Sequence, residues 1–81
     1  MTVWYVYVLR CGDGSFYTGA TTDVEKRVRA HQSGRGAKYT RSHAPVALAY
    51  FEEAADKSAA LRRENEIKRM THAEKEALIA R

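Results

Sequence analysis

The chain has one cysteine and one proline among its 81 residues. The single cysteine, Cys11, has no partner for an internal disulfide, which favours a reducing compartment, and we expect a cytoplasmic protein. The cysteine and the histidines show none of the paired spacings of a zinc site. No apolar run approaches the roughly 18–20 residues that span a bilayer, so no membrane partner is expected. The apolar N-terminal segment lacks the basic flank and the cleavage site of a signal peptide, and we interpret it as a strand.

Acidic residues are absent from residues 26–43, although the whole chain has a net charge of only +4. Histidines and a tyrosine are interleaved there with the cations Lys26, Arg27, Arg29, Arg35, Lys38 and Arg41. A basic segment with aromatic residues is typical of a surface that follows a phosphate backbone. A solvated basic face has the same composition, and the sequence leaves this alternative open.

Alternating apolar residues and turn residues predict a β-hairpin at the start of the chain. Residues 3–10 are rich in valine and aromatic residues, and residues 16–20 return after a glycine-containing turn. The hairpin brings Tyr7 and Tyr17 onto neighbouring strands. Whether these two tyrosines share a face depends on the register, which the sequence leaves open.

The remaining patterns predict helices and one more strand. Capping boxes at Thr22 and Glu25, and at Thr71 and Glu74, indicate the starts of the first and last helices. Gly34 suits a left-handed C-cap at the end of the first helix. The predicted elements are a helix over 23–32, a helical turn over 37–42, a strand over 46–52, a helix from Asp56 or Ser58 to about Met70, and a helix over 71–80. The order is β-β-α-β-α-α, in one α/β (α+β) domain over residues 1–81.

Two helical positions stand out as candidates for chemistry. His31 shares a face of the first helix with its valines, and Arg27 lies one turn earlier. Glu64 falls inside an apolar stripe that contains Ala60, Leu61, Ile67 and Met70. A carboxylate on an inward stripe is costly unless it is paired or binds a metal. An ion pair with Lys68, four residues on, is the structural alternative.

Phosphodiester hydrolysis needs a deprotonated water, neutralised phosphoryl charge and a stabilised leaving oxygen. A tyrosine orients or deprotonates water when nearby cations lower its pKa, and an arginine offers a planar fork that matches phosphate. One carboxylate is enough to hold Mg²⁺, which keeps most of its waters. Tyr7, Tyr17, Arg27, His31 and Glu64 supply these groups, but composition alone does not separate them from structural residues.

Four motifs, in order and on matching elements, resemble the GIY-YIG nuclease superfamily, and most closely its small single-domain bacterial members. They are Y-V-Y (5–7), Y-T-G (17–19), K-R-V-R-A-H (26–31) and R-E-N-E-I-K (63–68). The resemblance implies a small three-stranded antiparallel sheet flanked by helices. Gly19 matches the glycine of the second motif, where we expect a side chain to block the turn. The chain departs from the pattern at Tyr5, where glycine is usual, and at Thr18, where isoleucine or valine is common.

The resemblance also implies a role for each matching side chain. Tyr7 matches the general base, and Tyr17 matches the tyrosine that places water and the scissile phosphate. Arg27 matches the arginine that stabilises the phosphoryl transition state, and His31 matches a histidine found in many members. Glu64 matches the glutamate that binds one divalent ion, Mg²⁺ or Mn²⁺, and its helix is expected to bring the carboxylate near the hairpin tyrosines.

The sequence therefore predicts a metal-dependent DNA endonuclease with a role in DNA repair, recombination or DNA uptake. Phosphate contacts are assigned to Arg29, Arg35, Lys38 and Arg41. Because 81 residues leave no room for an added specificity domain, we expect little sequence reading. Single-stranded or branched structure, or a partner protein, would select the substrate. Two alternatives stay open, a non-catalytic nucleic-acid binding module and a protein-interaction domain that docks a partner through its apolar C-terminal helix.

Overall fold

A computed structural model of the chain describes residues 2–81. Its elements are β1 (Trp4–Cys11), β2 (Phe16–Thr21), α1 (Val24–Gln32), α2 (Lys38–Ser42), β3 (Val46–Ala54), α3 (Lys57–Lys68) and α4 (His72–Ile79). The strands form one antiparallel sheet in the order β2-β1-β3. This confirms the predicted fold class and element order, with α2 as the predicted helical turn. Residues 2–81 contain no helix that is long and apolar enough to cross a bilayer.

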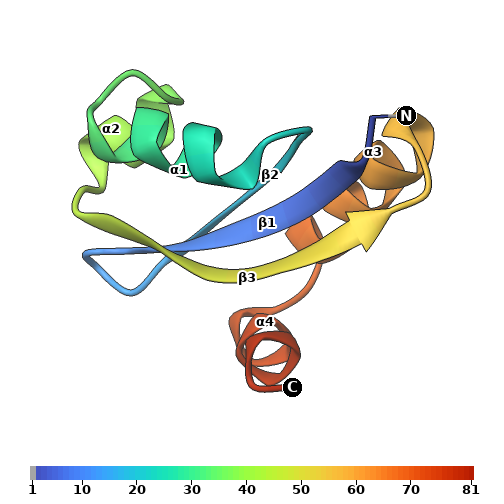
Figure 1. Cartoon of the computed structure of the whole chain (residues 1–81). Coiled ribbons are helices and arrows are strands. Elements are labelled where there is room, and N and C mark those ends of the chain that lie inside the picture. The colour runs from blue at the N-terminus through green and yellow to red at the C-terminus, as the bar shows by residue number, and fades with distance from the viewer. Residues whose placement is uncertain (1) are drawn as a thin grey trace.

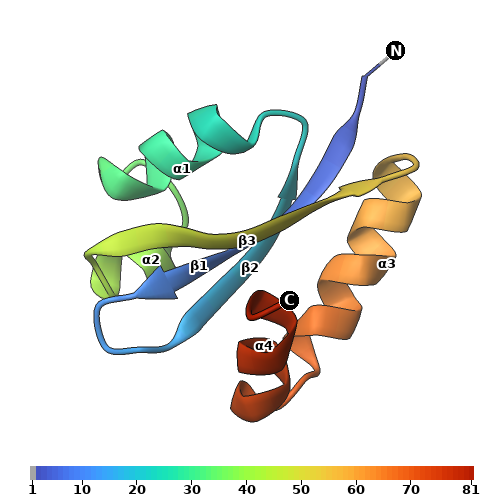
Figure 2. The same ribbon diagram turned by 60° about the horizontal axis from the view of Figure 1, so that its bottom comes forward.

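Helices cover both faces of the sheet. Figures 1 and 2 show α1 and α2 on one side and α3 and α4 on the other. Successive side chains of a strand point to opposite faces, so β1 supplies both cores. Val6 and Val8 pack with residues of α3 and α4, whereas Tyr7 and Leu9 pack with residues of α1. The central strand is therefore buried on both sides.

Most helix starts follow the predicted caps, and one differs. Thr71 and Glu74 form the predicted capping box of α4. The cap of α1 is Asp23, whose carboxylate accepts a hydrogen bond from the Lys26 N–H at 3.0 Å, so the prediction of Thr22 was wrong. The hydroxyl of Thr21 accepts from the Asp23 N–H at 3.1 Å, which turns the chain directly out of β2 and brings Asp23 to the cap position.

The apolar stripe of α3 is narrower than the sequence predicts. Ala60 and Ile67 are fully buried, but Leu61 is 43% exposed. Residues 60 and 67 are two turns apart on one face, and residue 61 is rotated by about 100° from that face. The buried stripe therefore passes through Ala60, Glu64 and Ile67 and leaves Leu61 outside.

A polar network fixes α3 to the sheet. The guanidinium of Arg63 donates from Nε to both carboxylate oxygens of Glu52 on β3, at 3.1 and 3.2 Å. The hydroxyl of Tyr50 donates to the same carboxylate at 2.6 Å. Because these groups are partly buried, the contact limits the positions that α3 can take.

A buried threonine on β2 gives a test of the packing against α3 and α4. The Thr18 side chain is 3% exposed, and its hydroxyl has no hydrogen-bond partner within residues 2–81. Because an unsatisfied buried hydroxyl keeps its desolvation cost, Thr18→Val should raise the free energy of unfolding by about 1 kcal/mol. Urea unfolding measures this change.

Thr40 is the matched control, because it is also buried but its hydroxyl has partners in Ala37 and His31. Thr40→Val should lower the free energy of unfolding by about 1–3 kcal/mol. Equal destabilisation by both substitutions would contradict the assignment of an unpaired hydroxyl at Thr18.

Candidate active site

The register of the hairpin places the two motif tyrosines on one face. Tyr7 lies opposite Gly19, and Leu9 lies opposite Tyr17. Directly opposed residues of an antiparallel pair share a face, so Tyr7 and Tyr17 are diagonal neighbours. This answers the question that the sequence left open. Their face is the one that α1 covers.

A chain of hydrogen bonds joins this face to the helices above it. The Tyr7 hydroxyl lies 2.9 Å from Nε2 of His31, and both side chains are buried. On the other side of the imidazole, Nδ1 lies 2.8 Å from the hydroxyl of Thr40 on α2. The ring of Tyr17 adds an aromatic contact to His31, with 5.1 Å between centroids. The imidazole is thus held by β1, β2 and α2 at once.

The hydrogen-bond partners of Thr40 indicate which group donates in each of these hydrogen bonds. Its hydroxyl donates to the Ala37 carbonyl at 2.9 Å, so its oxygen accepts from Nδ1–H of His31. Nε2 then has a free lone pair and accepts the Tyr7 O–H. The Ala37 N–H also points toward Nδ1, at 3.4 Å, and this contact is the longer and weaker of the two.

Two glycines make room for the two rings. A Cβ on Gly19 would overlap the phenol of Tyr7, and a Cβ on Gly36 would overlap the imidazole of His31. Gly19 is therefore needed for the close approach of Tyr7, and the expectation that a side chain would block the turn gave the wrong reason. No local pattern in the sequence relates Gly36 or Thr40 to His31, so neither was among the predicted site residues.

Burial keeps both hydrogen-bonded groups neutral near pH 7. Desolvation, with the neighbouring Tyr17 and Glu64, raises the pKa of Tyr7 to about 12, although the Arg27 guanidinium opposes this rise. Desolvation lowers the pKa of His31, and the positive charge of Arg27 lowers it further. A neutral phenol therefore faces a neutral imidazole, which has the capacity to accept its proton.

Arg27 and Glu64 lie on helices that cover opposite faces of the sheet, and only Arg27 is on the side of Tyr7 and His31. Arg27 is exposed on α1, and its charge acts on both Tyr7 and His31. Glu64 belongs to α3, on the opposite face of the sheet, and its side chain is 16% exposed. Its carboxylate lies 2.7 Å from Nζ of Lys68, which is the structural alternative that the sequence raised. The negative charge of Glu64 helps to raise the pKa of Tyr7, so the carboxylate acts electrostatically on the tyrosine face.

The residues present suit only one kind of metal site. No group of three or more His, Cys, Asp or Glu side chains within residues 2–81 could hold a metal ion. A single carboxylate such as Glu64 fits Mg²⁺, which keeps several waters and shares substrate phosphates. The same carboxylate does not fit zinc, which takes three or four protein ligands.

The four predicted phosphate contacts divide between two regions. Arg29 is on α1 and forms an exposed ion pair with Glu25 at 2.8 Å, and Arg35 follows in the loop. Lys38 and Arg41 are exposed on α2. Exposed ion pairs are weak, so Arg29 keeps its capacity to bind an anion.

Two adjoining hollows with basic residues in their lining lie along α1. Lys26, Arg29 and Arg35 line one hollow, and Lys26 and Arg27 line the second. The two hollows share Lys26 and Ala30, and the second is also lined by Asp23. A phosphate backbone along α1 would meet these four cations, with Asp23 as the one acid among them.

Comparison with known proteins identifies relatives over nearly the whole chain. Residues 3–77 match the family model of the GIY-YIG catalytic domain. A UPF0213 protein of Natronomonas pharaonis is 55% identical over 76 residues, which cover 94% of this chain and 89% of that protein. The UPF0213 protein YhbQ of Escherichia coli O8 is 48% identical over 80 residues, which cover 99% of this chain and 80% of that protein.

Solved structures show the same fold. The solution NMR structure of the UPF0213 protein BH0048 from Bacillus halodurans superposes with a TM-score of 0.61 at 46% identity. The match covers 96% of this chain and 83% of that one. The solution NMR structure of the protein EF2693 from E. faecalis gives a TM-score of 0.65 at 41% identity and covers 99% of this chain and 85% of that one. The names of these relatives state no activity.

Gly19→Ala tests the close approach of β2 to the Tyr7 ring. We expect the free energy of unfolding to fall by about 1–3 kcal/mol, because the added methyl group forces the phenol to move. The His31 ring signals in an NMR spectrum should shift at the same time, since the Tyr7 hydrogen bond is displaced.

Gly34→Ala is the control, because Gly34 has a φ of 82° and nothing within contact distance of an added Cβ. It should cost about 1–2 kcal/mol through backbone conformation and leave the His31 signals in place. Unchanged His31 signals in Gly19→Ala would contradict the proposed overlap.

Proposed function

Because the chain belongs to the GIY-YIG family, we propose that it is a metal-dependent endonuclease that hydrolyses phosphodiester bonds in DNA. The observation that carries this proposal is the buried hydrogen bond from Tyr7 to a neutral His31, on the face that also holds Tyr17. Arg27 supplies the positive charge beside this pair. These are the groups needed to activate a water and to bind a phosphate.

Tyr7 would act as a proton relay. A phenol with a pKa of about 12 holds its proton at neutral pH and is not itself a ready base. As the attacking water loses a proton to the Tyr7 oxygen, the phenol proton moves to Nε2 of His31 over the existing 2.9 Å hydrogen bond. The contact between Nδ1 and Thr40 stabilises the imidazolium that results. Tyr17, on the same face, would orient the water.

Arg27 would bind the scissile phosphate. Its planar guanidinium matches two phosphoryl oxygens, and its charge stabilises the extra negative charge of the transition state. Its exposure on α1 leaves it open to substrate, and Lys26 lines both its hollow and the adjoining one of Arg29 and Arg35. The same charge favours transient loss of the Tyr7 proton.

Glu64 would hold one divalent ion, Mg²⁺ or Mn²⁺. A bound ion supplies Lewis-acid stabilisation of the phosphoryl and leaving oxygens. α3 packs on β1 and β2, and β2 is an edge strand. The carboxylate would therefore serve the tyrosine face around this edge, after release from Lys68. The exposed Lys68 ammonium makes that release inexpensive.

The substrate would be selected by structure more than by sequence. We propose single-stranded or branched DNA, with Arg29, Arg35, Lys38 and Arg41 on backbone phosphates. Such contacts carry no base information. Residues 1–81 would act as one cytoplasmic domain in repair, recombination or DNA uptake, with a partner protein as a further source of specificity.

A non-catalytic nucleic-acid binding module is the second candidate. The 2.7 Å ion pair between Glu64 and Lys68 favours it, because it occupies the carboxylate that a metal would need. This alternative predicts salt-dependent binding that survives Glu64→Ala, without cleavage by the unmodified protein.

Cleavage assays separate the two candidates. Single-stranded, duplex and branched DNA are incubated with the protein and Mg²⁺ or Mn²⁺, and products are resolved on denaturing gels. Arg27→Ala should lower the cleavage rate by about 100-fold or more, as for loss of one transition-state donor, and Glu64→Gln should lower it by about as much because the metal ligand is lost.

Lys68→Gln is the matched control on the neighbouring turn of α3. It should retain cleavage and reach half-maximal rate at a lower metal concentration, because Glu64 is no longer paired. The enzyme proposal fails when the unmodified protein cleaves no faster than a double variant with Arg27→Ala and Glu64→Ala.

The pH dependence of cleavage tests the relay. Protonation of His31 removes its acceptor site, so kcat/KM should fall on the acid side. Burial and Arg27 lower the pKa of His31 from its ordinary value of 6.5, which places this acid limb below pH 6.5. For the same reason the free energy of unfolding should rise with pH in that window, where the unfolded chain binds more protons.

An NMR titration of the His31 ring provides the direct comparison. The relay requires that its pKa match the midpoint of the acid limb. A His31 that titrates at or above 6.5, or an acid limb unrelated to its titration, would contradict the assignment.

A further inference from the structure

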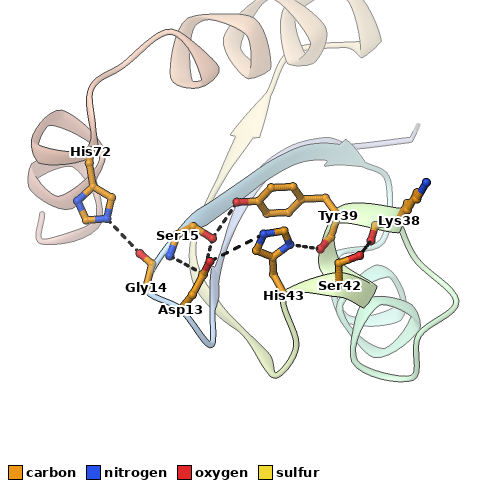
Figure 3. Close-up of polar contacts among 8 residues, drawn as sticks. All are labelled: Asp13, Gly14, Ser15, Lys38, Tyr39, Ser42, His43 and His72. Carbon is orange, nitrogen blue, oxygen red and sulfur yellow. Dashed lines mark hydrogen bonds and ion pairs between the residues drawn. The ribbon is translucent and has the colours of Figure 1, made fainter.

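Three aromatic rings form a ladder beside the candidate site. The ring of Tyr39 lies 5.9 Å from that of Tyr17, at an interplanar angle of 27°. His43 stacks on Tyr39 at 4.0 Å and 8°. Tyr39 contacts both other rings, so it is the middle of the ladder. Figure 3 shows the rings of Tyr39 and His43 together, on α2 and the residue that follows it.

Hydrogen bonds hold the rings of Tyr39 and His43 in place. The Tyr39 hydroxyl donates to Oγ of Ser15 at 2.8 Å, and Ser15 donates to Asp13 at 2.6 Å. Nδ1 of His43 lies 2.7 Å from the carbonyl oxygen of Tyr39, and its Nε2 lies 3.8 Å from Asp13 (Figure 3). The rings are therefore positioned in advance, and a ligand that stacks on them would not have to order them.

The ladder reaches from the candidate site to the surface. Tyr17 is at the inner end and contacts His31. Tyr39 is 38% exposed, and the His43 side chain at the outer end is 33% exposed. Lys38 and Arg41 lie on the same short helix and are exposed. Partly exposed aromatic rings, with two exposed cations on the same helix as Tyr39, combine the two features that single-stranded nucleic acid requires, stacking and phosphate contacts.

We propose that the ladder is a stacking subsite for an unpaired nucleobase, with His43 as the ring that the base covers. This subsite rests on the proposed nuclease function and names its substrate class, a single-stranded DNA segment. Bases within a duplex are already stacked on their neighbours, so only an unpaired base can occupy the ladder. A nucleotide stacked there would place the adjoining backbone near Tyr17 and the phosphate-binding groups.

The competing explanation is that the ladder only fastens the hairpin turn to α2. Two substitutions at one position separate these roles. His43→Phe keeps a ring and loses the hydrogen bond to the Tyr39 carbonyl. His43→Asn keeps a donor for that carbonyl and loses the ring.

Binding is measured in EDTA, so that no cleavage occurs, with single-stranded and fully duplex oligonucleotides. A single-stranded probe with 2-aminopurine at successive positions reports stacking through quenching of its fluorescence. Stacking on one exposed ring predicts that His43→Asn weakens single-strand binding by about 5- to 10-fold and reduces quenching. His43→Phe should keep both, and neither substitution should change duplex binding.

An oligonucleotide with an abasic site at the quenched position gives a test on the unmodified protein. The abasic strand should bind the unmodified protein about 5- to 10-fold more weakly than the intact strand does. Its affinity for His43→Asn should be no lower than that, because removing the base and removing the ring abolish the same contact. Equal loss in both His43 variants, or equal affinity for abasic and intact strands, would overturn the subsite. Ring-dependent binding without cleavage would overturn the enzyme proposal alone, and cleavage without ring dependence would overturn the subsite alone.

Discussion

The hydrogen bond between Tyr7 and His31 is the contact on which the candidate site depends. It connects the central strand to α1, and the Thr40 hydroxyl extends it to α2. Gly19 and Gly36 lie against the two rings and have no space for a side chain. Four separate segments of chain therefore meet at one buried polar pair, and a shift in any of them moves the pair.

Burial gives this contact its chemical character. The same loss of solvent raises the pKa of the phenol and lowers that of the imidazole, so both groups are neutral and the proton stays on Tyr7. The exposed guanidinium of Arg27 is then the charge that acts on both members of the pair. A phosphate that neutralises Arg27 would change the proton affinity of both groups, which couples substrate binding to proton transfer.

The packing of helices on both faces of the sheet sets the position of Glu64. Glu64 lies on α3, which Arg63 and Glu52 fasten to the face opposite the tyrosines. Its carboxylate is paired with Lys68 and influences Tyr7 only through its charge. A metal ion held by Glu64 would therefore have to serve the tyrosine face from the α3 side of the sheet.

Local patterns in the sequence determined the elements, because caps, turns and alternation depend on residues a few positions apart. They predicted the hairpin, the capping box of Thr71 and Glu74, and the left-handed Gly34, and the motifs indicated the family. Only the tertiary structure decided the strand register, which places Tyr7 and Tyr17 on one face. It decided as well that α3, which carries Glu64, packs on the other face. It also decided the packing of Gly36 against His31. These features arise from contacts between residues far apart in the chain, and no periodicity within one segment encodes them.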